Sequence, residues 1–152
     1  MEYVNAVQTK LALINRILAS IAQNDIFTND LVRINKVLNF DDYLDFDINN
    51  NGVVLFFIVS ASELTIYIDR AREVYDFSSA YVESEEETVS EIISAVFTCK
   101  MRIEYFGRHK TTITIVNRDS TVFASLKFST GISFILKPTK TKLVGPCFGS
   151  EN

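Results

Sequence analysis

The chain has one histidine, His109, which lies between Arg108 and Lys110 in a stretch that predicts a hairpin turn. A serine or cysteine nucleophile needs a histidine beside it and an acid that orients the imidazole ring. The neighbouring residues supply neither group, so the pattern favours an exposed loop residue. One histidine and two scattered cysteines, Cys99 and Cys147, also fall short of the four ligands of a tetrahedral zinc site. We therefore expect no enzyme, no metal and no cofactor.

Residues 47–52 match the first half of a calcium-binding EF-hand loop. Side chains with oxygen atoms recur at alternating positions from Asp47, and Gly52 stands where such a loop turns sharply. The twelfth position of the loop should be a bidentate glutamate, but it is Ile58. A buried strand, instead of a helix, is predicted to follow. These departures favour an ordinary turn.

Phosphate-binding loops are absent, since the chain has neither a Gly-x-Gly-x-x-Gly nor a Gly-Lys-Ser/Thr motif. Residues 100–110 combine basic side chains with two aromatic ones, which invites an RNA-binding interpretation based on base stacking. These residues are Lys100, Arg102, Tyr105, Phe106, Arg108 and Lys110. The signature of RNA-recognition strands is missing, however, and the acidic chain would repel phosphate. We expect no nucleic-acid partner.

The carboxylates are unevenly distributed, although the whole chain carries a net charge of only −4. Residues 41–91 hold thirteen acids and two bases, whereas residues 1–40 and 92–152 carry net charges of +1 and +6. This separation creates a field that steers a charged partner, unless the two regions pair within the fold or the acids are a solvated face. We predict a partner-binding surface that contains nine carboxylates: Asp41, Asp42, Asp45, Asp47, Glu83, Glu85, Glu86, Glu87 and Glu91.

The elements that would position these groups begin with a helix, because apolar residues over 4–21 recur at steps of three and four. Thr28 or Asn29 is suited to cap a second helix, whose apolar face lies within residues 31–38. An acidic loop is expected at residues 41–47. It leads into an asparagine-rich turn.

A continuous apolar run at residues 53–59 predicts a central strand that is buried on both faces. Alternation at residues 64–69 predicts its hairpin partner. Residues 70–83 show no clear period. Ser84 and Glu87 form a capping box, which predicts a third helix that ends near Cys99. Four further strands are expected within residues 101–105, 112–116, 122–128 and 132–136.

The predicted order is α-α-β-β-α-β-β-β-β, in which short links between strands favour antiparallel pairing. We expect one α+β domain over residues 1–144, followed by a loose tail at residues 145–152. Its mostly antiparallel, curved sheet of about six strands would carry the N-terminal helices and one central helix. A cone-like fold, in which a curved sheet wraps a helix, has a similar order of elements.

No secretory signal opens the chain, and its longest apolar run is far shorter than a membrane span. Two cysteines are too few for a disulfide framework. We therefore expect a cytoplasmic protein without a membrane partner.

The capped acidic segment at residues 84–91 and the alternating strand at residues 63–69 belong to a small acidic chain with a helical start and a β-rich second half. In these features the chain resembles bacterial immunity proteins of contact-dependent inhibition and related polymorphic toxin systems. The resemblance implies a cognate toxin domain that is bound tightly in the cytoplasm. A nuclease toxin would be basic because its substrate is phosphate, so an acidic protein could dock quickly and cover its active site.

Two other classes remain open. Secretion chaperones are also small, acidic α+β proteins, but they usually finish in a helix, whereas this chain is predicted to finish in a strand and a tail. A cone-like enzyme or small-ligand-binding protein would need a large cavity that contains polar groups. A buried acid or tyrosine in a pocket would favour this third class.

Overall fold

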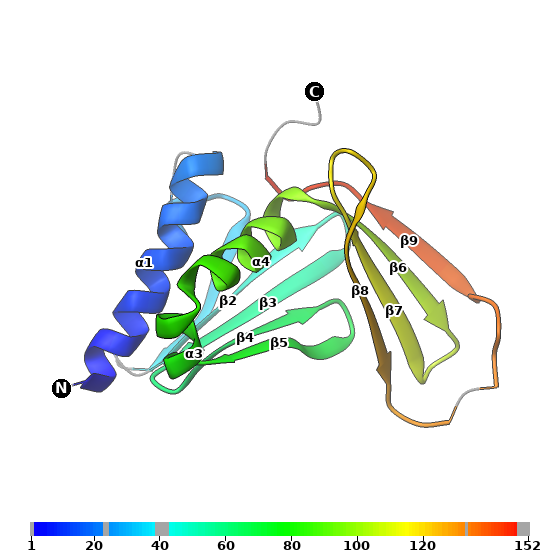
Figure 1. The fold of residues 1–152 in the computed structure, drawn as a ribbon, viewed down its shortest axis with the longest axis horizontal. Helices are drawn as coiled ribbons and strands as arrows, with labels where there is room; N and C mark the ends of the chain where they lie inside the picture. The colour runs from blue at the N-terminus through cyan, green and yellow to red at the C-terminus, as the bar shows by residue number, and fades with distance from the viewer. Residues whose placement is uncertain (1, 23–24, 39–42, 133, 149–152) are drawn as a thin grey trace. The chain divides into compact units, whose positions relative to one another are not determined.

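The computed structural model describes residues 2–22, 25–38, 43–132 and 134–148. The chain divides into two compact units, residues 1–94 and 95–152. In the described part of the chain, one helix and five strands are followed by two helices and then by four strands. Figure 1 draws these elements in the order of the chain, from blue to red. Among the described residues, no helix is both long enough and apolar enough to cross a membrane. The single domain expected over residues 1–144 stays a prediction.

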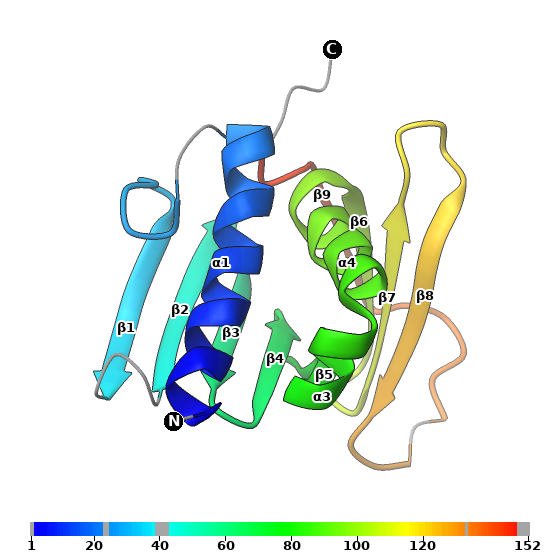
Figure 2. The ribbon, with the colours of Figure 1, turned by 60° about the vertical axis from the view of Figure 1, so that its left-hand side comes forward.

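The first unit is a five-stranded antiparallel sheet with helices on one face (Figures 1 and 2). Neighbouring strands follow one another in the chain because their links are short. The strands are β1 (Val32–Leu38), β2 (Tyr43–Asn50), β3 (Val53–Ser60), β4 (Glu63–Ile68) and β5 (Ala71–Ser78). The helices on this face include α1 (Glu2–Ala22) and the short α3 (Ser79–Ser84).

The core of the first unit lies between α1 and the sheet. The helix over residues 4–21 is confirmed, and its buried apolar residues include Val7, Leu11, Ile14 and Leu18. On the sheet, Phe46 of β2 and Phe57 of β3 are direct cross-strand neighbours, and their rings stack with centroids 4.8 Å apart. This buried face sets the register, because a slip by one residue would turn every apolar side chain away from α1.

The second helix predicted within residues 31–38 is wrong, because this segment forms β1. It pairs with β2 in an antiparallel ladder that places Val32 opposite Ile48. Asn29 does bind the backbone, since its side-chain oxygen accepts from the Leu31 N–H at 2.9 Å, but it does so in a turn. A short apolar pattern fits the helical and the strand period equally well, and pairing with a neighbouring strand decides between them.

The acidic loop predicted at residues 41–47 is wrong in its described part, since residues 43–47 lie in β2. The turn that follows is confirmed. Asn51 and Gly52 have φ values of 53° and 90°, the left-handed conformations that a tight hairpin turn requires. β3 is the central strand of its sheet, as expected. It is fully buried on one face only, because side chains such as Phe56 on the other face are half-exposed.

The central helix is present but begins differently from the prediction. Ser78 caps α3, and its hydroxyl accepts a backbone N–H of the first turn at 3.2 Å. Ser84 ends α3, so the predicted capping box with Glu87 is wrong. The longer helix α4 (Glu86–Thr98) follows after one residue and ends beside Cys99, as predicted.

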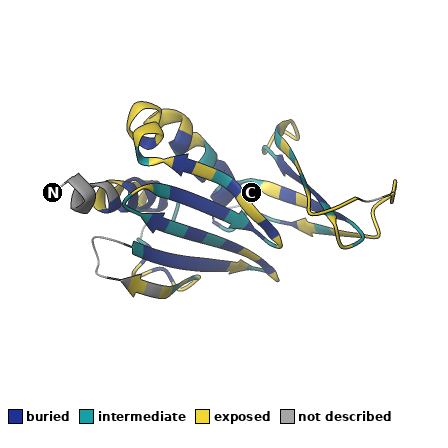
Figure 3. Cartoon of the chain, turned by 90° about the horizontal axis from the view of Figure 1, so that it is seen from below, coloured by how far each residue is buried: buried dark blue, intermediate teal, exposed yellow. Residues whose placement is uncertain are grey.

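The second unit contains a four-stranded antiparallel sheet in the order β8-β7-β6-β9. Alternation correctly predicted three of its strands, β6 (Lys100–Phe106), β7 (Lys110–Val116) and β8 (Val122–Ser129). The fourth strand is β9 (Lys140–Val144), whereas the predicted last strand at residues 132–136 belongs, in its described part, to the link before β9. Figure 3 shows this link as an exposed stretch of the chain.

Part of the tail that was expected to be loose packs against the end of α4. The Phe148 ring is buried and lies edge-to-face on the Phe97 ring, with centroids 5.4 Å apart. The Phe148 N–H also donates to the Phe97 carbonyl at 3.0 Å. This contact holds the chain after β9, while residues 149–152 lie outside the described range.

The α+β class and the antiparallel pairing are confirmed. The single sheet of about six strands is wrong, since the strands form two sheets of five and four. The structure has more strands than predicted because three were missed. β1 and β2 were interpreted as helix and loop, and β5 lies in the segment without a clear period.

Candidate functional site

Five of the nine predicted partner-binding residues lie together on α3, on α4 and between them. All five are exposed: Glu83, Glu85, Glu86, Glu87 and Glu91. No lysine or arginine occurs within residues 79–98. Arg16 of α1 pairs with Glu86 at 2.5 Å, but both side chains are more than half exposed, so the pair contributes little stability. Asp41 and Asp42 lie outside the described residues.

The remaining two predicted residues, Asp45 and Asp47, are buried in β2, with only 5% and 9% of their surface exposed. Asp47 Oδ2 accepts hydrogen bonds from Arg33 at 2.9 Å and from Asn35 at 2.8 Å, both on β1. The sequence suggested an exposed acidic loop, but a strand places both carboxylates on one face of the sheet among covering neighbours. They therefore do not belong to the exposed acidic surface.

Asp45 is tied to a neighbouring tyrosine. The Tyr43 hydroxyl donates to Asp45 Oδ2 at 2.7 Å, while Asp45 Oδ1 is buried and has no hydrogen-bond partner among the described atoms. Burial raises the pKa of Tyr43 to about 12, and the hydrogen bond to Asp45 and the negative charge of Asp45 act in the same direction. Tyr43 therefore keeps its proton at neutral pH and donates it in the hydrogen bond to Asp45.

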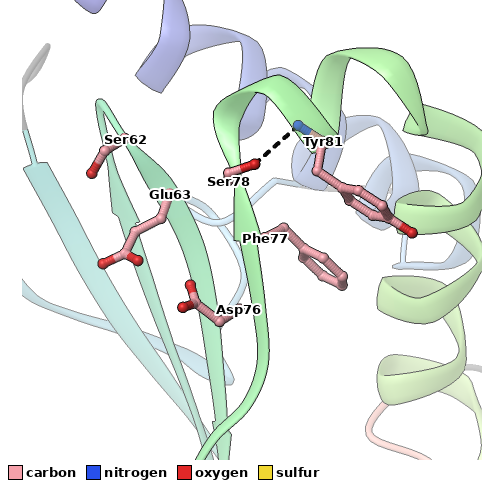
Figure 4. Close-up of a pocket in the computed structure, with 6 residues that line it drawn as sticks. All are labelled: Ser62, Glu63, Asp76, Phe77, Ser78 and Tyr81. Carbon is pink, nitrogen blue, oxygen red and sulfur yellow. Dashed lines mark hydrogen bonds between the residues drawn. The ribbon is translucent and has the colours of Figure 1, made fainter.

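A shallow pocket of about 490 Å³ opens where β4, β5 and α3 meet (Figure 4). Its lining combines two carboxyl groups, hydroxyl groups and two aromatic rings, from Ser62, Glu63, Asp76, Phe77, Ser78 and Tyr81. The rings of Phe77 and Tyr81 stack with centroids 5.7 Å apart. The carboxyl groups of Glu63 and Asp76 point toward one another in Figure 4.

The two carboxyl groups of the pocket share a hydrogen bond, which raises the pKa of Glu63. Burial and repulsion from the Asp76 charge raise this pKa further, and the nearby Lys10 ammonium opposes them. Thr65 fixes the other partner, because its hydroxyl donates to Asp76 Oδ1 at 3.0 Å. Asp76 therefore favours the protonated form of Glu63.

Lys10 approaches the pocket from α1 and is itself buried. Its ammonium donates to the carbonyl of Ser60 at 2.9 Å and to that of Ala61 at 3.4 Å, at the link between β3 and β4. Burial lowers the pKa of Lys10, while Glu83 and Glu63 oppose that shift. Sequence reasoning missed this residue, although its place three residues after Val7 on the apolar stripe was a signal.

Paired carboxyl groups with aromatic neighbours are suited to bind a cationic group, such as an amine or a guanidinium. A metal site is not formed in the described part of the chain, where no three histidine, cysteine or acidic residues lie close enough together. His109 is exposed in the β6–β7 turn, as predicted, and its Nδ1 lies 3.4 Å from Thr130 Oγ1.

Comparison of the chain with protein-family models, curated proteins and solved structures found no match. Two acidic features of the first unit remain as candidate binding sites. One is the set of glutamates on α3 and α4, and the other is the pocket at Glu63 and Asp76. The pocket was not predicted because it depends on the pairing of β4 with β5. That ladder contains an irregularity between Ile66 and Ile68, which obscures the period of residues 70–83.

Proposed function

We propose that this protein binds and neutralises a cognate toxin domain through the acidic surface of α3 and α4. This surface consists of Glu83, Glu85, Glu86, Glu87 and Glu91. The observation that carries the proposal is that all five carboxylates are exposed on two consecutive helices without an intervening base. Carboxylates gathered in this way complement a basic protein surface and accelerate its docking.

A nuclease toxin is the partner class that fits this charge. A protein that binds phosphate presents cations around its active site, and a carboxylate surface takes the place of the nucleic acid. The helices hold the acids on regular backbone, so docking does not require a loop to become ordered. The protein would act by binding alone, in the cytoplasm of the cell that makes the toxin.

Co-expression tests the proposal directly. The C-terminal domain encoded by the neighbouring upstream reading frame is produced with and without this protein, and cell survival and co-purification are scored. We expect toxicity that this protein relieves, together with a stable complex. Toxicity without rescue, or rescue without a complex, would contradict the proposal.

Charge-reversal variants test whether the glutamates of α3 and α4 form the toxin-binding surface. The variant E83K/E87K reverses two exposed glutamates of α3 and α4, and we expect it to lose rescue. The matched control D30K/E73K reverses two exposed acids elsewhere in the first unit and changes the net charge equally. We expect the control to rescue as well as the unaltered protein. Equal loss in both variants would show that only the net charge matters.

A second candidate function is the binding of a small cationic ligand, which the pocket at Glu63 and Asp76 favours. Asp76 raises the pKa of Glu63 through a hydrogen bond and through the repulsion between their charges. A bound amine or guanidinium would relieve that repulsion. Calorimetric titration with agmatine and spermidine tests this candidate, and D76N should abolish any binding that is seen.

A further inference from the structure

The link between β8 and β9 in the second unit presents apolar side chains to solvent. Ile132, Phe134 and Leu136 are 80%, 89% and 92% exposed. Apolar side chains exposed together, unlike ones that are scattered singly, mark a surface that another molecule covers. The sequence predicted a strand here, and the structure places the same apolar residues outside any ladder.

The link is held in place at both ends. The Thr130 N–H donates to the His109 carbonyl at 2.7 Å, and the Thr139 N–H donates to the Tyr105 carbonyl at 2.7 Å. Both acceptors lie at the end of the β6–β7 hairpin, and Figure 1 shows the link and the hairpin turn at the same end of the sheet. The exposed apolar residues therefore belong to a fastened segment that projects from one end of the unit.

One residue of the link turns inward and orients its neighbours. Ile135 is much less exposed than the others, at 39%, because it packs against Gly107 in the hairpin turn. A Cβ atom at Gly107 would lie only 2.6 Å from Ile135 Cδ1, and the φ of 68° at this position also favours glycine. With Ile135 as the anchor, Phe134 and Leu136 on either side of it project into solvent. We call the described apolar residues of this segment, Ile132, Phe134, Ile135 and Leu136, the apolar tip.

The surroundings of the apolar tip are basic. Residues 120–148 contain four lysines and no acid. Lys137 and Lys140 follow the tip directly, and Arg108 lies in the hairpin turn beside it, all three exposed. On the neighbouring strand β6, Glu104 is partly neutralised by Arg102 at 3.4 Å.

We propose that the apolar tip docks on an anionic lipid surface. Ile132, Phe134 and Leu136 enter the interface between headgroups and acyl chains, and Arg108, Lys137 and Lys140 contact the anionic headgroups. Lysine side chains suit this place, because their stems lie along apolar surface while the ammonium stays in water. Charge complementarity favours an anionic lipid, because the apolar tip is accompanied by the exposed cations Arg108, Lys137 and Lys140.

A folded partner fits the tip less well than a lipid surface does. The described part of the tip forms no strand that could extend a partner's sheet, and its apolar side chains project from an irregular backbone. A fluid interface accepts such side chains without a complementary shape. The sequence predicted no membrane partner because it has no spanning segment, but a docking tip does not need one. This proposal is independent of the toxin and involves a different unit.

Vesicle flotation with the full chain tests the proposal. We expect the protein to float with phosphatidylcholine vesicles that contain phosphatidylglycerol, and to stay behind with phosphatidylcholine alone. The variant F134S/L136S should weaken the partition by about tenfold or more, because two apolar side chains no longer leave water. K137Q/K140Q should weaken it by about fivefold for each lost cation.

Matched controls lie at the opposite end of the four-stranded sheet. Val122, which is 59% exposed, begins β8, and Arg118 lies in the turn before it. V122S and R118Q should leave the partition unchanged. No flotation of the unaltered protein on anionic vesicles would overturn the proposal, and so would equal losses in the controls. A mass in light scattering that is twice the chain mass and returns to one chain in F134S/L136S would assign the tip to a second copy instead.

Discussion

Glu63 of β4 and Asp76 of β5 are diagonal neighbours on the ladder, because the direct cross-strand partner of Asp76 is Thr65. Hydrogen bonding with Asp76 is the main cause that raises the pKa of Glu63. Two carboxylates in contact cannot both ionise without repulsion, so one of them keeps a proton to a higher pH. Each belongs to a strand whose other face is buried, with Ile66 of β4 beside the core. The pairing of these two strands therefore brings the two acids close together, and a proton or a cation relieves the repulsion between them.

This relationship predicts a pH dependence of stability. The raised pKa of Glu63 means that the folded state holds its proton more tightly than the unfolded state does. The contribution to stability is fully present below the ordinary glutamate pKa and is lost as pH rises through the raised value. The variant D76N removes the repulsion and keeps an oxygen that accepts from Thr65. We expect D76N to unfold at a higher temperature than the unaltered protein near neutral pH.

Thermal unfolding followed by circular dichroism from about pH 3 to about pH 8 measures this difference. The two proteins should converge at the acidic end, where both carboxyl groups are protonated. D30N, which removes an exposed acid at another position, serves as the control and should follow the unaltered protein throughout. A constant offset between D76N and the unaltered protein at every pH would show that the acids do not compete for a proton.

Tyr43 predicts a second titration. Its pKa is raised to about 12, chiefly by burial and also by the hydrogen bond to Asp45. The phenol therefore stabilises the fold fully below about pH 10, and this contribution is lost as pH rises from about 10 to about 12. We expect D45N to lower the pKa of Tyr43 only part of the way, because burial remains. Tyrosinate absorbance of the folded protein measures both values, and Y43F identifies the step that belongs to Tyr43. A Tyr43 that titrates with the exposed tyrosines would contradict this prediction.

The stacked pair of Phe46 and Phe57 predicts the largest loss of stability. Both rings are fully buried between the sheet and α1. Replacement of Phe57 by alanine removes the stacking and leaves a cavity, so we expect a cost of about 3–5 kcal/mol. F46A/F57A should cost less than the two single variants together, because each single change already breaks the stack. Denaturation with urea measures these values, and strict additivity would show that the rings act independently.

How far the sequence predicts this fold depends on which residues decide each element. Alternation of apolar and polar residues over 101–128 correctly placed β6, β7 and β8. Their burial differs, since β6 buries one face, β7 is buried on both faces and β8 is half-buried at most. The same reasoning failed at residues 132–136, where Ile135 packs on Gly107 in the β6–β7 turn and no strand forms in the described part of the segment. It also failed for β1, which is half-exposed at an edge and depends on its hydrogen bonds to β2. Local pattern therefore predicts strands whose apolar and polar residues alternate along the chain, but not elements that depend on a distant partner.

In the candidate site too, local sequence pattern predicted some residues correctly and failed for those that depend on a distant partner. The glutamates of α3 and α4 were predicted correctly as exposed residues, because dense charge favours contact with solvent. Asp45 and Asp47 carried the same signal of charge density, but alternation in β2 with Phe46 and Ile48 places them on one face of a covered strand. The pairing of Glu63 with Asp76 joins two segments through a ladder that composition does not reveal. Charge density alone therefore does not separate exposed acids from those held by partners.

The measurement that tests the central claim most directly is the rate at which the toxin domain associates with this protein, followed by stopped flow at low and high salt. The account predicts that E83K/E87K slows association by about tenfold or more at low salt. The two rates should approach each other at high salt, where exposed charges are screened. D30K/E73K should associate nearly as fast as the unaltered protein. An E83K/E87K variant that folds normally and associates at the unaltered rate at low salt would contradict the claim that α3 and α4 form the docking surface.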